Sequence, residues 1–284
     1  MKKYPIKIIK RDFEFLDLDY STKGTRVKKI IVDNSNKMAF FKYEGAGYVG
    51  SEACSEKMSY EIAKVLGYDC ARIELAKDYE GTLGILNYLF FDIGTDEHTD
   101  AVSYLNINNQ QRKEFYTISN IKKTLNNLNK NLFKEFIKIM IFDALVGEQD
   151  RHEENWGIIR KKEHYKISPL YDNGDCLLRD FKRESFAEEY YSGKKNFEAY
   201  IKRSKTTIYK EDHVHKYKHF ELIEYLNTLY PKYVQAEIEN LKKLTDKKIE
   251  TIVDRIPDDL LTIRHKEYII DYLKKRRNIL LNIK

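Results

Sequence analysis

One stretch restricts the fold of this chain more than any other, because a strongly apolar helical pattern runs directly into a charged loop. Apolar side chains recur at the helical period from Leu132 to Leu145, at Leu132, Phe133, Phe136, Ile137, Met140, Ile141, Ala144 and Leu145. The loop that follows reads Gly147-Glu148-Gln149-Asp150-Arg151-His152-Glu153-Glu154-Asn155-Trp156. The sequence therefore predicts a buried helix that leads into a polar, charged loop.

A predicted β-hairpin follows this loop. Its strands run from Trp156 to Arg160 and from Tyr165 to Leu170, and a charged turn joins them. Asp150 and Asn155 lie five residues apart before the hairpin, and Asp172 lies 17 residues after Asn155, at the hairpin's exit. A helix, a loop and a hairpin in this order can aim all three side chains at one point.

This layout suits phosphoryl transfer. The reaction needs a carboxylate that accepts a proton from, or orients, the attacking hydroxyl, and two oxygen ligands that hold magnesium against the phosphates. Protein kinases place an Asp and an Asn five residues apart in a loop, with a metal-binding Asp after a hairpin. The alternative is a loop with ordinary surface carboxylates, since Asp and Asn are common turn residues. The position between helix and hairpin favours the first interpretation.

The rest of the chain divides into a β-rich first part and a helical second part. Short strands bounded by polar turns are expected at Ile6–Lys10, Phe13–Asp17, Val27–Asp33, Met38–Glu44, Cys70–Ala76 and Thr82–Phe91, with one helix at Ser51–Leu66. Further helices are expected at Phe220–Leu229, Val234–Leu244, Lys247–Arg255 and Lys266–Leu281. We predict an α+β fold with two lobes, residues 1–92 and 93–284, that meet near Phe91 to Asp96.

Composition excludes several classes of protein. With 284 residues and 42% hydrophobic side chains, the chain can build a large core, so disorder is not expected. The net charge of +6 fits an acidic ligand such as a nucleotide, but it is too diffuse to predict direct nucleic-acid binding. The one compact basic run, Lys274 to Arg277, is interpreted as cations in the last turns of a helix.

The cysteines and the hydrophobic runs bear on location. Three cysteines without a CxxC pair suggest neither a disulfide framework nor a zinc site, which fits a reducing cytoplasm. The first residues show no signal peptide, and no apolar stretch is long enough to cross a bilayer. We therefore expect a cytoplasmic protein, with secretion or delivery to another cell left open.

The motif residues carry a specific resemblance. Gln149-Asp150-Arg151-His152 with Asn155, followed by Leu170-Tyr171-Asp172, resembles the HipA-like serine/threonine kinases, and within them the compact CtkA-like members. The Asp-Arg-His-x-x-Asn form is also similar to phosphatidylinositol kinases, whose catalytic core is related. By the order of its motifs, the resemblance extends from about Lys23 to about Leu281.

The resemblance implies a protein-kinase-like fold and ATP-dependent phosphorylation of serine or threonine in a protein. It also implies that Asp150 is the catalytic base and that Asn155 and Asp172 bind magnesium (Mg2+). Members of this family are often toxins paired with a DNA-binding antitoxin, so such a partner is expected here as well.

The first lobe is expected to bind the ATP phosphates. Lys42 lies in an aromatic strand and resembles the ATP-binding lysine of the family, although a solvent-facing strand lysine is the plain alternative. Such a lysine needs a carboxylate on the next helix, and Glu56 is preferred over Glu61 because the family carries its glutamate early in this helix. By resemblance, Gly24, Thr25 and Arg26 belong to the phosphate loop, and Ser21, Thr22 and Thr25 are candidate autophosphorylation sites.

Three other patterns receive plainer interpretations. Gly45 to Gly50 matches GxGxxG, but no buried parallel strand precedes it and no βαβ units follow, so we expect a mobile turn. The histidines His213, His215 and His219 are expected on a solvated loop or helix edge. Trp156 is expected to be a packing anchor.

The sequence leaves the activity open between two classes. The first is an active kinase, and the second is a kinase-fold binding module that docks an antitoxin or another partner. A lipid or small-molecule kinase is a further alternative within the first class. The polar segment Arg179 to Lys218 is expected to include the activation and substrate region, but its composition does not identify the acceptor.

Overall fold

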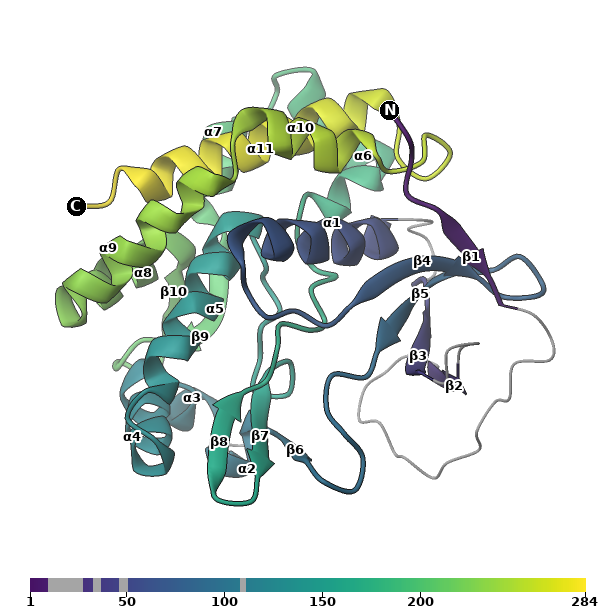
Figure 1. Cartoon of the computed structure of the whole chain (residues 1–284). Helices are drawn as coiled ribbons and strands as arrows, with labels where there is room; N and C mark the ends of the chain where they lie inside the picture. Colours follow the sequence, from purple (N-terminus) through teal and green to yellow (C-terminus); the bar gives the residue numbers. More distant parts are fainter. Residues whose placement is uncertain (10–27, 33–36, 46–50, 108–110) are drawn as a thin grey trace.

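A five-stranded sheet forms the first part of the fold. The computed structural model describes residues 1–9, 28–32, 37–45, 51–107 and 111–284 (Figure 1). The strands lie in the order β1-β4-β5-β3-β2, where only β1 and β4 are parallel. Their bounds are β1 Ile6–Ile8, β2 Lys28–Val32, β3 Met38–Tyr43, β4 Ile73–Lys77 and β5 Leu83–Tyr88. The expected mostly antiparallel sheet is confirmed, while the strand predicted at 13–17 lies outside the described residues.

The two faces of the sheet carry different side chains, because successive residues of a strand point to opposite faces. Ala39 and Phe41 of β3 are buried in a small core on one face, together with Ile31, Leu86 and Tyr88. Lys42 therefore points to the opposite face, where β3 runs beside β5 with Lys42 opposite Ile85.

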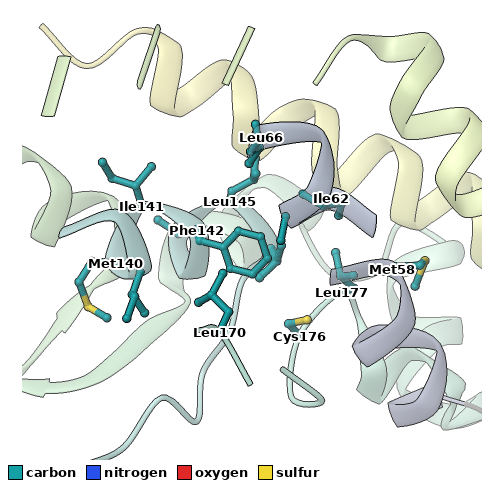
Figure 2. Close-up of a cluster of buried hydrophobic side chains, with 14 of the residues drawn as sticks. Met58, Ile62, Leu66, Met140, Ile141, Phe142, Leu145, Leu170, Cys176 and Leu177 are labelled. Atoms are coloured by element: carbon teal, nitrogen blue, oxygen red, sulfur yellow. The ribbon is translucent and has the colours of Figure 1, made fainter. Parts of the chain in front are cut away.

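Helix α1 (Ser51–Leu66) joins the sheet to the helical part of the molecule. It contacts β4 on one side and α10 (Asp246–Asp254) on the other (Figure 1). Figure 2 shows side chains from α1, α5 and the segment after the hairpin in one apolar cluster that includes Met58, Ile62, Leu66, Phe142, Leu145, Leu170 and Leu177. The helix predicted for the first lobe thus shares its core with the second half of the chain.

The helical part is arranged around α5 (Leu132–Val146), the helix expected from its apolar period. The other helices are α2 Ala101–Tyr104, α3 Arg112–Phe115, α4 Ile118–Leu128, α6 Glu184–Tyr191, α7 Phe197–Arg203, α8 His219–Leu229, α9 Pro231–Asn240 and α11 Ile263–Leu281, with 3-10 turns η1 at Arg179–Lys182 and η2 at Leu241–Lys243. All four helices predicted after residue 219 are confirmed, although the one predicted at Val234–Leu244 ends in η2 instead of continuing as α-helix.

Two small sheets complete the helical part. β6 (Glu97–Asp100) extends the predicted hairpin of β7 (Gly157–Lys161) and β8 (His164–Ile167). A second hairpin, β9 (Lys205–Tyr209) and β10 (Lys216–Lys218), was not predicted, and it lies within the polar segment assigned to the activation and substrate region. None of the helices in the described ranges is long and apolar enough to span a membrane.

Trp156 is a packing anchor, as predicted. Only 2% of its surface is exposed, its ring centroid lies 4.7 Å from that of Phe136, and its Nε1 donates to the Tyr116 hydroxyl at 2.9 Å. The turn predicted at Gly45 to Gly50 lies outside the described residues after Gly45.

Gly147 ends α5 in a conformation that other residues rarely adopt. Its φ of 76° is left-handed, and its N–H bonds the Asp143 carbonyl at 2.7 Å. A Cβ atom added at Gly147 would lie 1.9 Å from the hydroxyl of Tyr272, a buried residue of α11. The C-terminal helix therefore packs directly against the start of the polar loop.

We expect Gly147→Ala to lower the free energy of unfolding by about 2 kcal/mol or more, because it adds steric overlap with Tyr272 to backbone strain. The matched control is Gly193→Ala, where φ is 75° but no atom lies within 4 Å of the added Cβ, so only the strain of about 1 kcal/mol remains. Urea denaturation of both variants measures the difference. Equal losses would show that the Gly147–Tyr272 contact relaxes at no cost.

Candidate active site

The buried guanidinium of Arg151 connects the polar loop to the segment after the hairpin. Its Nη2 lies 3.0 Å from the Asp143 carboxylate on α5. Its Nη1 donates to two carbonyl oxygens, that of Asn155 at 2.9 Å and that of Tyr171 at 2.6 Å, and Nη2 also donates to the Asn173 side chain. One side chain thus fixes the loop and the residues on both sides of Asp172.

The charges of this network stabilise one another. Burial alone lowers the pKa of Arg151, but the carboxylates of Asp143 and Glu148 outweigh it and raise the pKa above its ordinary value. Burial raises the pKa of Asp143, against the lowering effect of Arg151. Arg151 and Asp143 form a buried ion pair, so removal of either partner leaves a charge without compensation.

Asp150 and Asn155 stand at the mouth of this loop. The Asp150 side chain is 55% exposed, while its backbone N–H donates to Glu148 Oε1 at 2.8 Å. Asn155 is buried, and its Nδ2 donates to the Asp150 carbonyl at 2.7 Å. This bond fixes the amide so that Oδ1 is its atom available as a metal ligand. The loop therefore offers the accessible carboxylate of Asp150 and the oriented amide oxygen of Asn155.

Asp172 has an unusual backbone conformation that its neighbours maintain. Its φ is 54°, in the left-handed region that costs a non-glycine residue energy. The residues on both sides, Tyr171 and Asn173, are bonded to Arg151, and the Asn173 N–H donates to Glu56 Oε2 at 3.0 Å. Strained residues that their surroundings fix in this way are frequent in functional sites.

Lys42 meets the carboxylates of α1 and of Asp172. Its Nζ lies 3.3 Å from Glu56 Oε1 and 3.2 Å from Glu52 Oε1, and it is also paired with the Asp172 carboxylate. Burial raises the pKa of Glu56, and Lys42 counteracts that effect. Glu61, the alternative partner, instead pairs with Lys57 at 2.7 Å. The structure thus brings together Lys42, Glu56 and Asp172.

The first turn of α1 is attached to both sides of the site. The Glu44 carboxylate, two residues after Lys42, accepts from the backbone N–H groups of Glu52 at 2.9 Å and Ala53 at 2.8 Å, and so caps the helix. A Cβ atom at Gly174 would lie 2.5 Å from Glu52 Cγ, so the glycine after Asn173 permits this close approach. The sequence analysis did not predict a role for Glu52.

An apolar pocket lies on the sheet face that carries Lys42, beside the chain that leaves β5. It is lined by Ile30, Met38, Ala39, Phe40, Leu89, Phe91 and Ile93. Next to it, Phe90 stacks on Tyr171 with ring centroids 5.4 Å apart. Phe90 lies between the pocket residues Leu89 and Phe91, and Tyr171 directly precedes Asp172, so this stacking contact links the pocket to the Asp172 segment.

A second buried network supports the loop from α8 and α11. His219 Nε2 donates to the Glu148 carbonyl at 2.7 Å, and its Nδ1 lies 3.1 Å from Arg276 Nη2. Burial and the neighbouring Arg276 lower the pKa of His219 to about 3, so the imidazole is neutral. Arg276 also donates from Nε to the Ala144 carbonyl at 2.7 Å.

These positions correct two predictions. His213 and His215 are exposed as expected, but His219 is buried, and its ring donates to the Glu148 carbonyl in the polar loop. Arg276, interpreted as a helix-end cation, is fully buried between α11 and α5.

The analysis of the sequence also missed Asp143, Glu148 and Arg151. Asp143 was detectable as the acidic residue near the end of an apolar helix. Arg151 and Glu148 lie among charged neighbours, which gave no sign that they are buried. Burial raises the pKa of Glu148 well above its ordinary value.

The remaining predicted site residues lie outside the described part of the chain. They are the phosphate-loop candidates Gly24, Thr25 and Arg26 and the autophosphorylation candidates Ser21, Thr22 and Thr25. Their roles stay predictions.

Comparison with known protein families and sequences gives two findings. The model of the HipA-like C-terminal domain matches residues 20–175. The serine/threonine-protein kinase CtkA of Helicobacter pylori strain J99 is 25% identical over 150 residues, which cover 52% of this chain and 45% of that protein. The aligned region thus spans less than half the length of this relative.

Solved structures resemble the whole chain. The proinflammatory kinase CtkA of Helicobacter pylori matches with a TM-score of 0.82 at 19% identity, over 98% of this chain and 96% of that one. HipA of Shewanella oneidensis MR-1, solved with HipB and operator DNA, matches with a TM-score of 0.59 at 11% identity, over 92% and 64%. These likenesses confirm the predicted protein-kinase-like fold.

We expect Arg151→Met to destabilise the protein by about 3–5 kcal/mol, because it leaves the Asp143 carboxylate buried without its partner. Arg160→Met is the matched control, since Arg160 is 43% exposed and lies 3.9 Å from Glu97, a surface pair worth about 1 kcal/mol or less. Urea denaturation measures both losses. A loss in Arg151→Met as small as that of the control would contradict the central position of Arg151.

Proposed function

We propose a kinase activity for this chain on the premise that it belongs to the HipA-like C-terminal domain family, whose model matches residues 20–175. The resemblance seen in the sequence is confirmed by this membership. The proposed reaction transfers the γ-phosphoryl group of ATP to a serine or threonine hydroxyl of a protein. The observation that carries the proposal is the Arg151 network, which brings the loop of Asp150 and Asn155 to Asp172.

The proposed nucleotide site combines the apolar pocket with Lys42. An adenine ring suits a pocket lined by aliphatic and aromatic side chains, and Phe40 and Lys42 lie on the same face of β3. Lys42 is directed to the phosphates by Glu56, as a strand lysine and a helix glutamate do in protein kinases. The N-terminal lobe, residues 1–92 in this proposal, thus supplies most of the nucleotide contacts.

The oxygen atoms of Asn155 and Asp172 fit magnesium. Hard cations of this kind prefer carboxylate and carbonyl oxygens. The Asn155 amide uses its Nδ2 in the bond to the Asp150 carbonyl, which leaves Oδ1 as the atom that can bind the metal. Asp172 supplies a partly exposed carboxylate beside it in the network. Magnesium, when bound, neutralises charge on the phosphates. The chain's part is to fix both ligands through Arg151.

Asp150 is the proposed base. Its carboxylate is exposed, while its backbone is fixed by Glu148 and Asn155. The carboxylate accepts the proton of the acceptor hydroxyl as the hydroxyl oxygen forms its bond to the γ-phosphorus and the bond to the leaving oxygen of ADP breaks. A binding module without catalysis would have no physical need for this combination of groups.

The partners of this kinase are also proposals. Ser21, Thr22 and Thr25 precede the strand β2 and are proposed as autophosphorylation sites. A DNA-binding antitoxin is proposed because HipA was solved with HipB and operator DNA. The role of toxin rests on the same likeness.

We expect Asp172→Asn to lower turnover by roughly 100-fold or more, because the variant keeps an oxygen but loses the charge that binds magnesium. Thermal stability should change little, since Asp172 is partly exposed. The control is Asp92→Asn, whose side chain is 80% exposed and lies 3.9 Å from Lys161. Rates at increasing magnesium concentration check the assignment. Full activity in Asp172→Asn, or of the wild-type protein in excess chelator, would contradict it.

We expect Asp150→Asn to abolish nearly all phosphoryl transfer while ATP still binds, because other residues contact the nucleotide. Mass spectrometry after incubation with ATP should find phosphoserine or phosphothreonine at Ser21, Thr22 or Thr25 in the wild-type protein and none in the variant. Calorimetry measures the ATP affinity of both proteins. Phosphate at the same sites in both proteins would remove Asp150 from the mechanism.

A further inference from the structure

The unpredicted hairpin of β9 and β10 is attached to the catalytic loop itself. The carbonyl oxygen of Arg151 accepts from the Tyr116 hydroxyl at 2.8 Å and from the Thr207 hydroxyl of β9. Tyr209, at the end of β9, donates from its backbone to the Tyr116 carbonyl at 2.9 Å. The hairpin therefore has a fixed position relative to Asp150, the residue before Arg151.

Lys216 lies on β10, the second strand of this hairpin. It pairs with Tyr209 in the β9–β10 register, and its Nζ lies 5.3 Å from the centre of the Tyr209 ring. The side chain is half-buried, and burial lowers its pKa, as do the charges of Arg112 and Lys205, whereas the carboxylates of Asp150 and Glu153 act in the opposite direction. Within the described ranges no carboxylate lies within ion-pair distance of Lys216, in contrast to Lys210, which pairs with Glu221.

Two further cations lie in the same electrostatic environment. Arg112 of α3 has its Nε 3.0 Å from Glu153 Oε2, and Lys205, at the start of β9, is exposed. The positive charges of both residues lower the pKa of Lys216. We call Arg112, Lys205 and Lys216 the hairpin basic cluster. A half-buried lysine among like charges is stabilised when an anion binds to it.

We infer that the hairpin basic cluster binds an acidic side chain of the acceptor protein, close to the hydroxyl that is phosphorylated. The inference rests on the proposed kinase function and adds a substrate class to it: serine or threonine next to aspartate or glutamate. It follows from charge complementarity, because the hairpin that carries Lys205 and Lys216 is bonded to the carbonyl of Arg151, the residue after the exposed Asp150, where the acceptor must approach.

The transferred phosphoryl group is the other anion that could reach these cations. The arrangement of the elements favours the acceptor. Lys42 and Glu56 approach the site from the sheet and α1, whereas the β9–β10 hairpin is anchored on the helical side through Tyr116 (Figure 1). The nucleotide phosphates and the hairpin basic cluster therefore lie on different sides of the catalytic loop.

The test measures kcat/KM with three peptides that differ only in the residues flanking one serine, which are glutamate, glutamine or lysine. Wild-type protein should prefer the glutamate peptide over the glutamine peptide by about five- to tenfold. Lys216→Gln should remove this preference, and the charge reversal K216E should favour the lysine peptide, a gain that misfolding cannot produce. Lys232→Gln, at an exposed position of α9, is the control that should keep the wild-type preference.

Each other outcome overturns the inference in a distinct way. Equal rates of the wild-type protein on all three peptides, or an unchanged preference in Lys216→Gln, would show that the cluster does not select the acceptor. An equal loss on all peptides in Lys216→Gln would assign the cluster to the transferred phosphoryl group. If wild-type protein phosphorylates no peptide or protein, the proposed function fails, and calorimetry of the glutamate peptide with wild-type and K216E proteins then decides the binding separately: equal affinities would overturn the inference.

Discussion

The buried guanidinium of Arg151 is the interaction on which the candidate site depends. It joins α5 through Asp143, the polar loop through the Asn155 carbonyl, and the segment of Asp172 through Tyr171 and Asn173. A buried ion pair seldom adds net stability compared with an apolar contact of similar volume, because both charges lose their hydration. Its value here is geometric: the planar, five-donor guanidinium fixes three chain segments at once. We infer that this residue is retained for the arrangement of the site more than for the stability of the fold.

Helix α1 connects the segment around Asp172 to the sheet. Glu56 accepts from the Asn173 backbone and pairs with Lys42, so one buried carboxylate connects the Asp172 segment with β3. The opposite face of the same helix is part of the apolar cluster shared with α5 (Figure 2). The sheet, the helical part and the catalytic loop are therefore coupled through short contacts, and a shift of α1 would move Lys42 and Asp172 together.

Much of this fold was predictable, and the reasons for the exceptions are physical. The apolar period identified α5, and the spacing of Asp150, Asn155 and Asp172 between a helix and a hairpin identified the candidate site. The roles of these residues came from family resemblance, since spacing alone also describes a surface loop. His219 was expected at a solvated edge and Arg276 among helix-end cations, and no burial was expected of Arg151, because composition places charged side chains at the surface. Their burial depends on tertiary partners such as Asp143, which lie far away in sequence or carry no local pattern. The β9–β10 hairpin was missed because its strands are short and rich in lysine and threonine.

We propose that the network around Arg151 arranges Asp150, Asn155 and Asp172 for phosphoryl transfer to a protein hydroxyl. The most direct measurement incubates the purified wild-type protein with γ-labelled ATP and magnesium, alone and with a panel of whole-cell lysates, and follows the label in proteins and in lipids. The account predicts magnesium-dependent label on serine or threonine of the protein itself or of lysate proteins. Label found only in a lipid or a small molecule, or no transfer under any of these conditions, would contradict it.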